Sequence, residues 1–181
     1  AVTIDIDDAS LAARGQWPWP RSELASLVSR LQEMGAVAIV FDIVFPEPDR
    51  LSPEQIAKRF PAEGTLAEAG RLLSAAPTND GLFADAIARA GVVMAFAGVH
   101  GHGPVRLPPK VAELEYNGDD PKIFVPPFPN AVVNLPALSA KASGSGFNNW
   151  IPEQDQIIRK LPLLLQIGGN LYPSIAAEGL R

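Results

Sequence analysis

The stretch from Val2 to Asp49 constrains the fold most, because two strand-like runs flank one amphipathic helix. Residues 2–7 alternate between apolar and polar side chains, which is typical of a half-buried strand. Residues 36–41 are continuously apolar and rich in β-branched side chains, which favours a strand buried on both faces of a parallel sheet. Between them, apolar residues at positions 24, 27, 28 and 31 form one stripe of a helix. The order strand, helix, strand predicts a right-handed crossover between parallel strands.

Pro20 and Gly35 suit the first position and the C-terminal end of this helix. Because the carboxyl ends of parallel strands open onto one edge of a sheet, acidic residues after both strands should lie close together there, with Asp49 in the loop beyond. Ligands of open α/β sheets usually bind at that edge. We therefore predict a ligand-binding site formed by Asp5, Asp7, Asp8, Trp17, Arg21, Asp42, Phe45 and Glu47.

The acidic residues of this edge have two interpretations. Carboxylates from neighbouring strands can hold a hard cation, or one can act as a base when a neighbour raises its pKa. In the structural interpretation, Asp7 or Asp8 caps a turn, and Asp42 pairs with Arg21 or with a backbone amide. The structural interpretation is favoured because carboxylates at strand ends are common, and no metal is expected.

The loop before the helix contains two tryptophans, Trp17 and Trp19, each followed by proline, and then Arg21. Indole faces and a guanidinium suit a pocket for a small organic or anionic ligand. Alternatively, the tryptophans cover the strand ends while the prolines stiffen the entry into the helix. The structural role is favoured here as well.

The second quarter of the chain repeats the helix, glycine, strand order. Two short helices are expected near residues 53–60 and 65–74 of a proline-rich stretch. Asp80 is a candidate N-cap for a further helix that ends at Gly91, and residues 92–99 are typical of another buried strand. Two such units favour a mainly parallel sheet with covering helices.

The second half of the chain is less regular. Residues 101–130 contain seven prolines and predict irregular or edge structure. A short helix at 135–142, a turn at 144–146 and an extended piece at 147–151 follow. A strand at 157–167, a tight turn at Gly168 and a helix starting at Pro173 complete the chain. We therefore predict one α/β domain over residues 1–181, with a mainly parallel central sheet and antiparallel additions near the C-terminus.

Composition excludes several functions. The net charge of −5, the pI near 5.0 and the lack of a basic run exclude a nucleic-acid surface. The absence of cysteine excludes disulfides, thiolate metal sites and cysteine nucleophiles. No apolar run reaches the length of a membrane span, and no glycine-rich phosphate loop is present, so no cofactor is expected. His100 and His102 are better explained by a surface loop than by a metal site.

One enzymatic alternative deserves comparison. Asp5 and Asp7 after an apolar run are similar to the paired aspartates of haloacid-dehalogenase-type phosphatases, in which the first attacks phosphorus and the second moves a proton. The later acidic pair that would hold magnesium should follow a buried strand. Asp119 and Asp120 follow a stretch that is too polar to be one. A magnesium-dependent phosphatase is therefore the second hypothesis.

The chain resembles a known family at both ends. Its opening is similar to that of a CHASE sensory domain of the second class, the cyclase- and histidine-kinase-associated sensory extracellular domain. The opening motif consists of Asp7-Asp8 before Ser10-Leu11, Gly15, Trp17 to Arg21, and Gly35 to Asp42 leading to Phe45 and Glu47. The closing motif consists of Asp155, Ile158-Arg159, Pro162-Leu163 and Tyr172-Pro173-Ser174 through Ala177-Glu178. Gln156 stands where the family pattern has glycine.

The resemblance implies the extracytoplasmic sensor of a bacterial transmembrane receptor, periplasmic or at the cell surface and tethered to the membrane. A membrane helix would precede the domain and several would follow it. The output would be a nucleotide cyclase, a histidine kinase or a serine/threonine kinase. The family supplies no catalytic residues and no general ligand, so we expect a non-enzymatic domain that binds an unknown small molecule or protein signal, as a homodimer. A third hypothesis is a purely structural interaction module.

Overall fold

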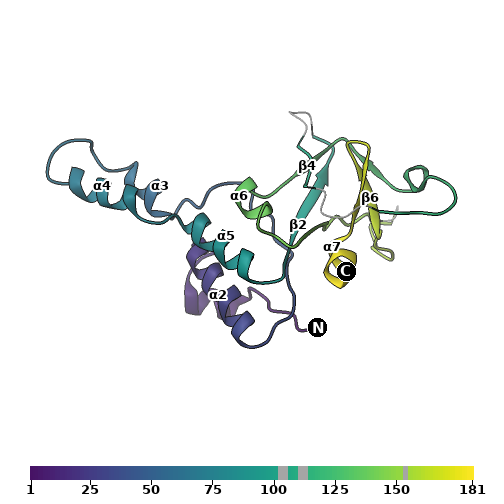
Figure 1. Ribbon diagram of the computed structural model, residues 1–181, viewed down its shortest axis with the longest axis horizontal. Helices are drawn as coiled ribbons and strands as arrows, with labels where there is room; N and C mark the ends of the chain where they lie inside the picture. Colours follow the sequence, from purple (N-terminus) through teal and green to yellow (C-terminus); the bar gives the residue numbers. More distant parts are fainter. Residues whose placement is uncertain (102–105, 110–113, 153–154) are drawn as a thin grey trace.

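The computed structural model describes residues 1–101, 106–109, 114–152 and 155–181 (Figure 1). It contains the predicted amphipathic helix as α2 (Arg21–Glu33), which buries Leu24 and Val28. Pro20 is the N-cap rather than the first helical residue, and Gly35, with φ +89°, lies just beyond the helix end. The strand that follows is β1 (Ile39–Phe41), shorter than the apolar run that predicted it.

The second helix and strand unit is also present. Helix α5 (Asn79–Arg89) packs against α2 and leads into β2 (Val92–Val99), the strand predicted at those residues (Figure 1). The N-cap of α5 is Thr78, whose side chain accepts a hydrogen bond from Gly81 N, so the prediction that Asp80 caps the helix is wrong. A threonine hydroxyl one position before the helix can reach that amide, whereas Asp80 lies inside the first turn.

Strand β2 is the centre of the main sheet. Its first half pairs in parallel with β1 on one side, and β5 (Gly144–Phe147) pairs in parallel on the other side. Its second half pairs with β4 (Asn130–Val132) in the antiparallel sense. A second sheet has the order β3-β6-β7, with bounds Pro127–Phe128, Leu164–Ile167 and Asn170–Pro173. The predicted fold class, mainly parallel with antiparallel additions, is confirmed.

The two sheets enclose separate apolar clusters. The first lies between α2, α5 and β1, and its rings Phe41, Phe45 and Phe83 pack edge to face with centroids 5.4, 5.5 and 6.0 Å apart. The second lies between the later half of β2 and the β6–β7 hairpin, and it contains Phe96 and Tyr172. Strand β2 supplies side chains to both clusters, because Met94 belongs to the first and Phe96 to the second.

Besides α5, four short helices and one 3₁₀ turn follow α2 in the described part of the chain. Helices α3 (Pro53–Ala57) and α4 (Ala67–Ala75) pack on each other and extend away from the sheets (Figure 1). Helix α6 (Pro136–Ser139) lies beside α5, and α7 (Ile175–Leu180) packs on β5. The 3₁₀ turn η1 spans Pro121–Ile123. In the described part of the chain, no helix is long and apolar enough to span a membrane.

The predicted strand at residues 2–7 is wrong. Residues 1–7 form no helix or strand, and α1 (Asp8–Arg14) begins directly after them. Asp7 accepts hydrogen bonds from Ser10 N and Ser10 Oγ, and this N-cap ends the extended run. None of the strands in the described residues pairs with residues 2–6, and Val2 is 90% exposed. The crossover expected between strands on either side of α2 is therefore absent, and β1 finds its parallel partner in β2 instead.

Three predictions in the C-terminal part are also corrected. Residues 144–146 belong to the buried strand β5 rather than to a turn. Position 146 is glycine because a side chain there would meet the backbone of Ile175, whose Cα would lie 2.5 Å from the added Cβ. The glycines therefore allow α7 to approach the sheet. The strand predicted at 157–167 is confined to β6, and Pro173 ends β7, with Ser174 as the N-cap of α7. Gln156 adopts φ +63°, a left-handed conformation that glycine enters most easily.

Candidate functional site

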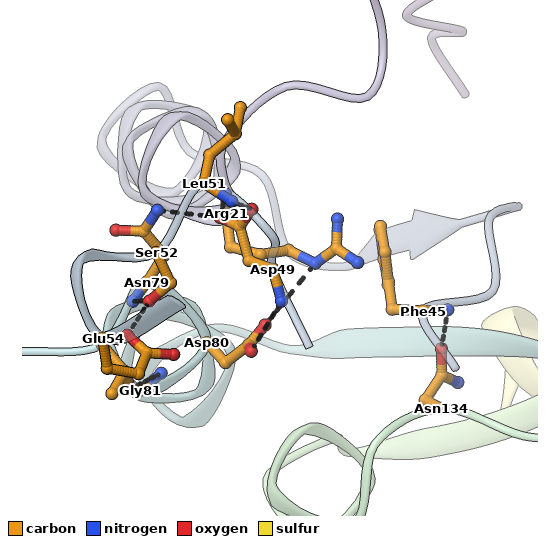
Figure 2. A network of polar contacts seen from close by, with 11 residues as sticks. Arg21, Phe45, Asp49, Leu51, Ser52, Glu54, Asn79, Asp80, Gly81 and Asn134 are labelled. Carbon is orange, nitrogen blue, oxygen red and sulfur yellow. Dashed lines mark hydrogen bonds and ion pairs between the residues drawn. The ribbon is translucent and has the colours of Figure 1, made fainter. Parts of the chain in front are cut away.

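A buried polar network joins the start of α2, the start of α5 and the loop after β1 (Figure 2). Its centre is Asp49, which is 5% exposed. One carboxylate oxygen accepts hydrogen bonds from Arg21 N at 2.7 Å and Asn79 Nδ2 at 2.8 Å, and the other accepts from Leu51 N at 2.9 Å. Pro20 has no side-chain acceptor for the amides of the first turn of α2. Asp49 therefore supplies from a distant loop the cap that the local sequence lacks.

Ser52 connects the same loop to α5. Its Oγ accepts a hydrogen bond from Asn79 N at 2.9 Å and donates one to Glu54 Oε2. Ser52 is fully buried, and Asn79 is nearly so. Together with the bonds of Asp49, these contacts fix residues 49–54 against the first turn of α5.

Arg21 and Asp80 face each other inside this network without a direct hydrogen bond. Arg21 Nε lies 3.7 Å from Asp80 Oδ1, and neither atom has a hydrogen-bond partner among the described residues. The other carboxylate oxygen of Asp80 accepts from Asp49 N at 3.0 Å. Burial raises the pKa of Asp80, against the opposing effects of its bond to Asp49 N and of Arg21. Burial lowers the pKa of Arg21, against the attraction of Asp80 and Asp49.

Phe45 provides the surface on which the Arg21 guanidinium lies, with the central carbon 4.2 Å from the ring centroid. Asn134 holds the backbone at Phe45, because its Oδ1 accepts from Phe45 N at 2.7 Å and its Nδ2 donates to Ala95 O at 2.7 Å (Figure 2). The amide of Leu135 also donates to Phe45 O. The side chain of Asn134 thus continues the pairing along β2 between the end of β1 and the end of β4.

Of the predicted site residues, the structure brings Arg21 and Phe45 together. Trp17 and Trp19 pack edge to face with ring centroids 5.6 Å apart, and both lie against the first apolar cluster. Trp19 Nε1 donates to Gly15 O at 2.8 Å. The tryptophans thus contribute to packing at the entry into α2, as the structural interpretation expects. A ligand-binding role for any of these residues stays a prediction.

The predicted acidic residues do not converge. Asp7 caps α1, as the structural interpretation predicts, and its bonds to Ser10 lower its pKa. The side chains of Asp5, Asp8 and Glu47 are exposed and make no hydrogen bond with a described residue. Asp42 accepts from Asn148 Nδ2 at 2.9 Å, so its predicted pairing with Arg21 or a backbone amide is wrong. Among the described residues no group of three or more histidine or acidic side chains can hold a metal ion.

These placements also bear on the remaining candidates. A phosphatase needs Asp5 and Asp7 at the end of a buried strand, and residues 1–7 form none. His100 stacks on Phe128 with ring centroids 4.6 Å apart, and His102 lies outside the described residues. Two depressions open to solvent, of about 420 Å³ at Trp150 to Leu161 and about 520 Å³ between α3 and α4, contain no residue of the Arg21 network.

Sequence reasoning missed four members of the network: Asp49, Ser52, Asn79 and Asp80 as a partner of Arg21. One signal was available. Pro20 leaves the first amides of α2 without a local side-chain acceptor, which indicates that water or an acceptor from elsewhere in the chain binds them. Asp42, Glu47 and Asp49 are equally plausible from sequence, and only the path of the loop selects Asp49.

The family of the chain is identified by comparison with known proteins. A family model described as the CHASE2 domain matches residues 1–181, the whole chain. Comparisons with curated proteins and with solved structures find no match.

Proposed function

The chain belongs to the CHASE2 domain family, whose members are extracellular sensory domains of signalling receptors, and from this premise we propose that it senses a small ligand outside the cytoplasm for a transmembrane receptor. The family match along the whole chain carries this proposal. The receptor is membrane-tethered, with the domain in the periplasm or at the cell surface, and its output is a cyclase, a histidine kinase or a serine/threonine kinase. The domain itself performs no catalysis.

The ligand site proposed for this sensor lies at Arg21 and Phe45, two of the residues predicted from the sequence. Arg21 and Phe45 are the predicted site residues in direct contact, and Arg21 joins α2 to α5 through Asp49 and Asp80. Helix α5 leads directly into β2, the central strand of the main sheet, and α7 packs on β5, which pairs with β2. A ligand that prefers one position of Arg21 would therefore bias the α5–β2 unit, and through it α7.

The size of the required bias follows from a two-state equilibrium. A shift from 1:99 to 99:1 needs a differential affinity of about 5.5 kcal/mol. Rearrangement of a buried ion pair and its hydrogen bonds is on this scale, since hydrogen bonds to charged groups contribute about 1.5–3 kcal/mol each. We propose that two copies of the chain work together as a homodimer. Sedimentation over a range of concentrations tests this part, and a monomer throughout would contradict it.

The location is tested with a single cysteine. The chain has none of its own, so Glu47→Cys places one exposed thiol in the loop before the network. In intact cells that make the complete receptor, a membrane-impermeant maleimide is expected to label this thiol. A cysteine placed in the output domain serves as the control and should react only after lysis. Labelling of Glu47→Cys only after lysis would contradict an extracytoplasmic sensor.

A further inference from the structure

The side chain of Arg21 is nearly buried, and its guanidinium has no hydrogen-bond partner among the described residues. Arg21 is 8% exposed, and its side chain carries five N–H donors. None of them donates to an acceptor in the described part of the chain, and of the three guanidinium nitrogens only Nε is completely buried, so the two Nη groups keep contact with solvent. A buried donor without an acceptor is unfavourable, and more so when it is charged, and this applies to Nε. The fold therefore maintains an arginine whose hydrogen-bonding capacity it does not use.

The free donors point in one direction. The Nε edge of the guanidinium faces Asp80, whereas both Nη groups point away from Asp80 and Asp49, toward the side where Phe45 lies (Figure 2). The Phe45 ring holds the guanidinium plane, and Asn134 holds the backbone of Phe45. Two parallel N–H groups on a fixed plane match the two oxygens of a carboxylate or phosphate.

The electrostatic surroundings permit an anion at this position. Helices α2 and α5 both begin in the network and place the positive ends of their dipoles there. The carboxylate of Asp49 is occupied by three N–H donors, and one oxygen of Asp80 by the amide of Asp49. Both carboxylates thus compensate backbone and amide donors, and neither accepts a hydrogen bond from the Nη groups of Arg21.

We propose that the two Nη groups of Arg21 form the recognition point for the ligand of this sensor, and that the ligand carries a carboxylate or phosphate group. This inference rests on the sensor function proposed above and adds the chemical class of the ligand. Phe45 contributes by keeping the guanidinium plane in place, and Asp80 is the positioning residue on the Nε side.

The experiment is a titration of the chain with defined anions, followed in ¹H–¹⁵N spectra by the Arg21 Nε–H signal in the wild type and by the backbone amide signal of residue 21 in the wild type and in every variant. The probes are acetate and inorganic phosphate, with acetamide as the neutral counterpart of acetate and sodium chloride at matched ionic strength. A saturable shift of the Arg21 signal is expected with acetate, with phosphate or with both, and none with acetamide. The anion that binds more tightly identifies the carboxylate or the phosphate class.

Two variants and a control complete the test. Arg21→Gln should abolish the saturable response, and Arg21→Lys, which keeps the charge but loses the paired donors, should weaken it about tenfold or more. Arg30→Gln is the control, because Arg30 lies on the exposed face of α2 and pairs with Glu33. If Arg21→Gln does not fold, the wild-type and Arg21→Lys titrations still decide the question.

Three results would overturn the inference: no saturable shift with either anion, an equal shift of the Arg30 signal, or an unchanged affinity in Arg21→Lys. The labelling of Glu47→Cys does not depend on any ligand. If Glu47→Cys is labelled in intact cells but the titration shows no saturable shift, the proposal of an anionic ligand is wrong and the proposed sensor function still stands.

Discussion

Replacement of Asp49 is the sharpest test of the network. Asp49→Ala removes the acceptor of three donors, of which Arg21 N and Asn79 Nδ2 are buried and Leu51 N lies nearer the surface. Each buried donor left without an acceptor costs about 1–3 kcal/mol, whereas the amide of Leu51 can turn to water. We expect a loss of about 4 kcal/mol in the free energy of unfolding. For a chain of this length the melting temperature should then fall by about 8–16 °C.

Two matched variants calibrate this value. Asp49→Asn keeps one oxygen for Arg21 N and Asn79 Nδ2 but places its NH₂ group against Leu51 N, so a loss of about 1–2 kcal/mol is expected. Glu47→Ala, two residues earlier in the same loop and exposed, should change stability by less than about 0.5 kcal/mol. The assay is urea unfolding followed by circular dichroism, with the slope m held constant between variants. If Asp49→Ala unfolds within about 1 kcal/mol of the wild type, the capping role assigned to Asp49 is refuted.

Three further predictions concern neighbouring features. Asn134→Ala should cost about 2–4 kcal/mol in urea unfolding, because Phe45 N and Ala95 O both lose their partner, and a loss below about 1 kcal/mol would contradict the bridging role. Gly146→Ala should cost about 1–3 kcal/mol or more, since the added Cβ meets the backbone of Ile175, while Gly101→Ala, with open space around it, should be nearly neutral in the same assay. Burial raises the pKa of Asp80, so the folded protein binds the proton of this carboxyl more tightly than the unfolded chain does. The contribution of Asp80 to the free energy of unfolding is therefore most favourable below about pH 3.8, and it is lost as the pH rises through the folded pKa. Asp80→Asn should therefore gain stability relative to the wild type between acidic and neutral pH, and a pH-independent difference in urea unfolding would contradict this.

The helices and strands with strong periodicity could be predicted from sequence, and the reasons are local. The stripe of α2 and the apolar run of β2 each contain their own signal, and both elements appear where they were expected. Residues 2–7 carry an equally clear alternation, but a strand also needs a partner, and Asp7 instead starts α1. The glycines of β5 were mistaken for a turn because the reason for them is the approach of α7, which lies about thirty residues later in the chain.

In the candidate site too, the locally determined part could be predicted and the part that depends on distant residues could not. Arg21 and Phe45 belonged to the predicted set, because the loop before α2 and the end of β1 lie close in any fold with this helix and strand. The partners of Arg21 come from residues 49–54 and 79–80, and their contacts depend on how a long loop returns to two helix starts. The path of this loop leaves no periodic pattern in the sequence, so these contacts could not be predicted. The acidic residues after the supposed first strand were included because of a strand that does not form.

The central position of strand β2 determines how the protein unfolds. It contributes side chains to both apolar clusters and hydrogen bonds to three other strands, so neither cluster can open without breaking pairs that the other uses. The amide hydrogens of Val93 to Phe96 should therefore exchange with deuterium only through complete unfolding, with one common free energy of opening. The α3–α4 extension shares none of these pairs, and its amides should exchange earlier, as a separate unit.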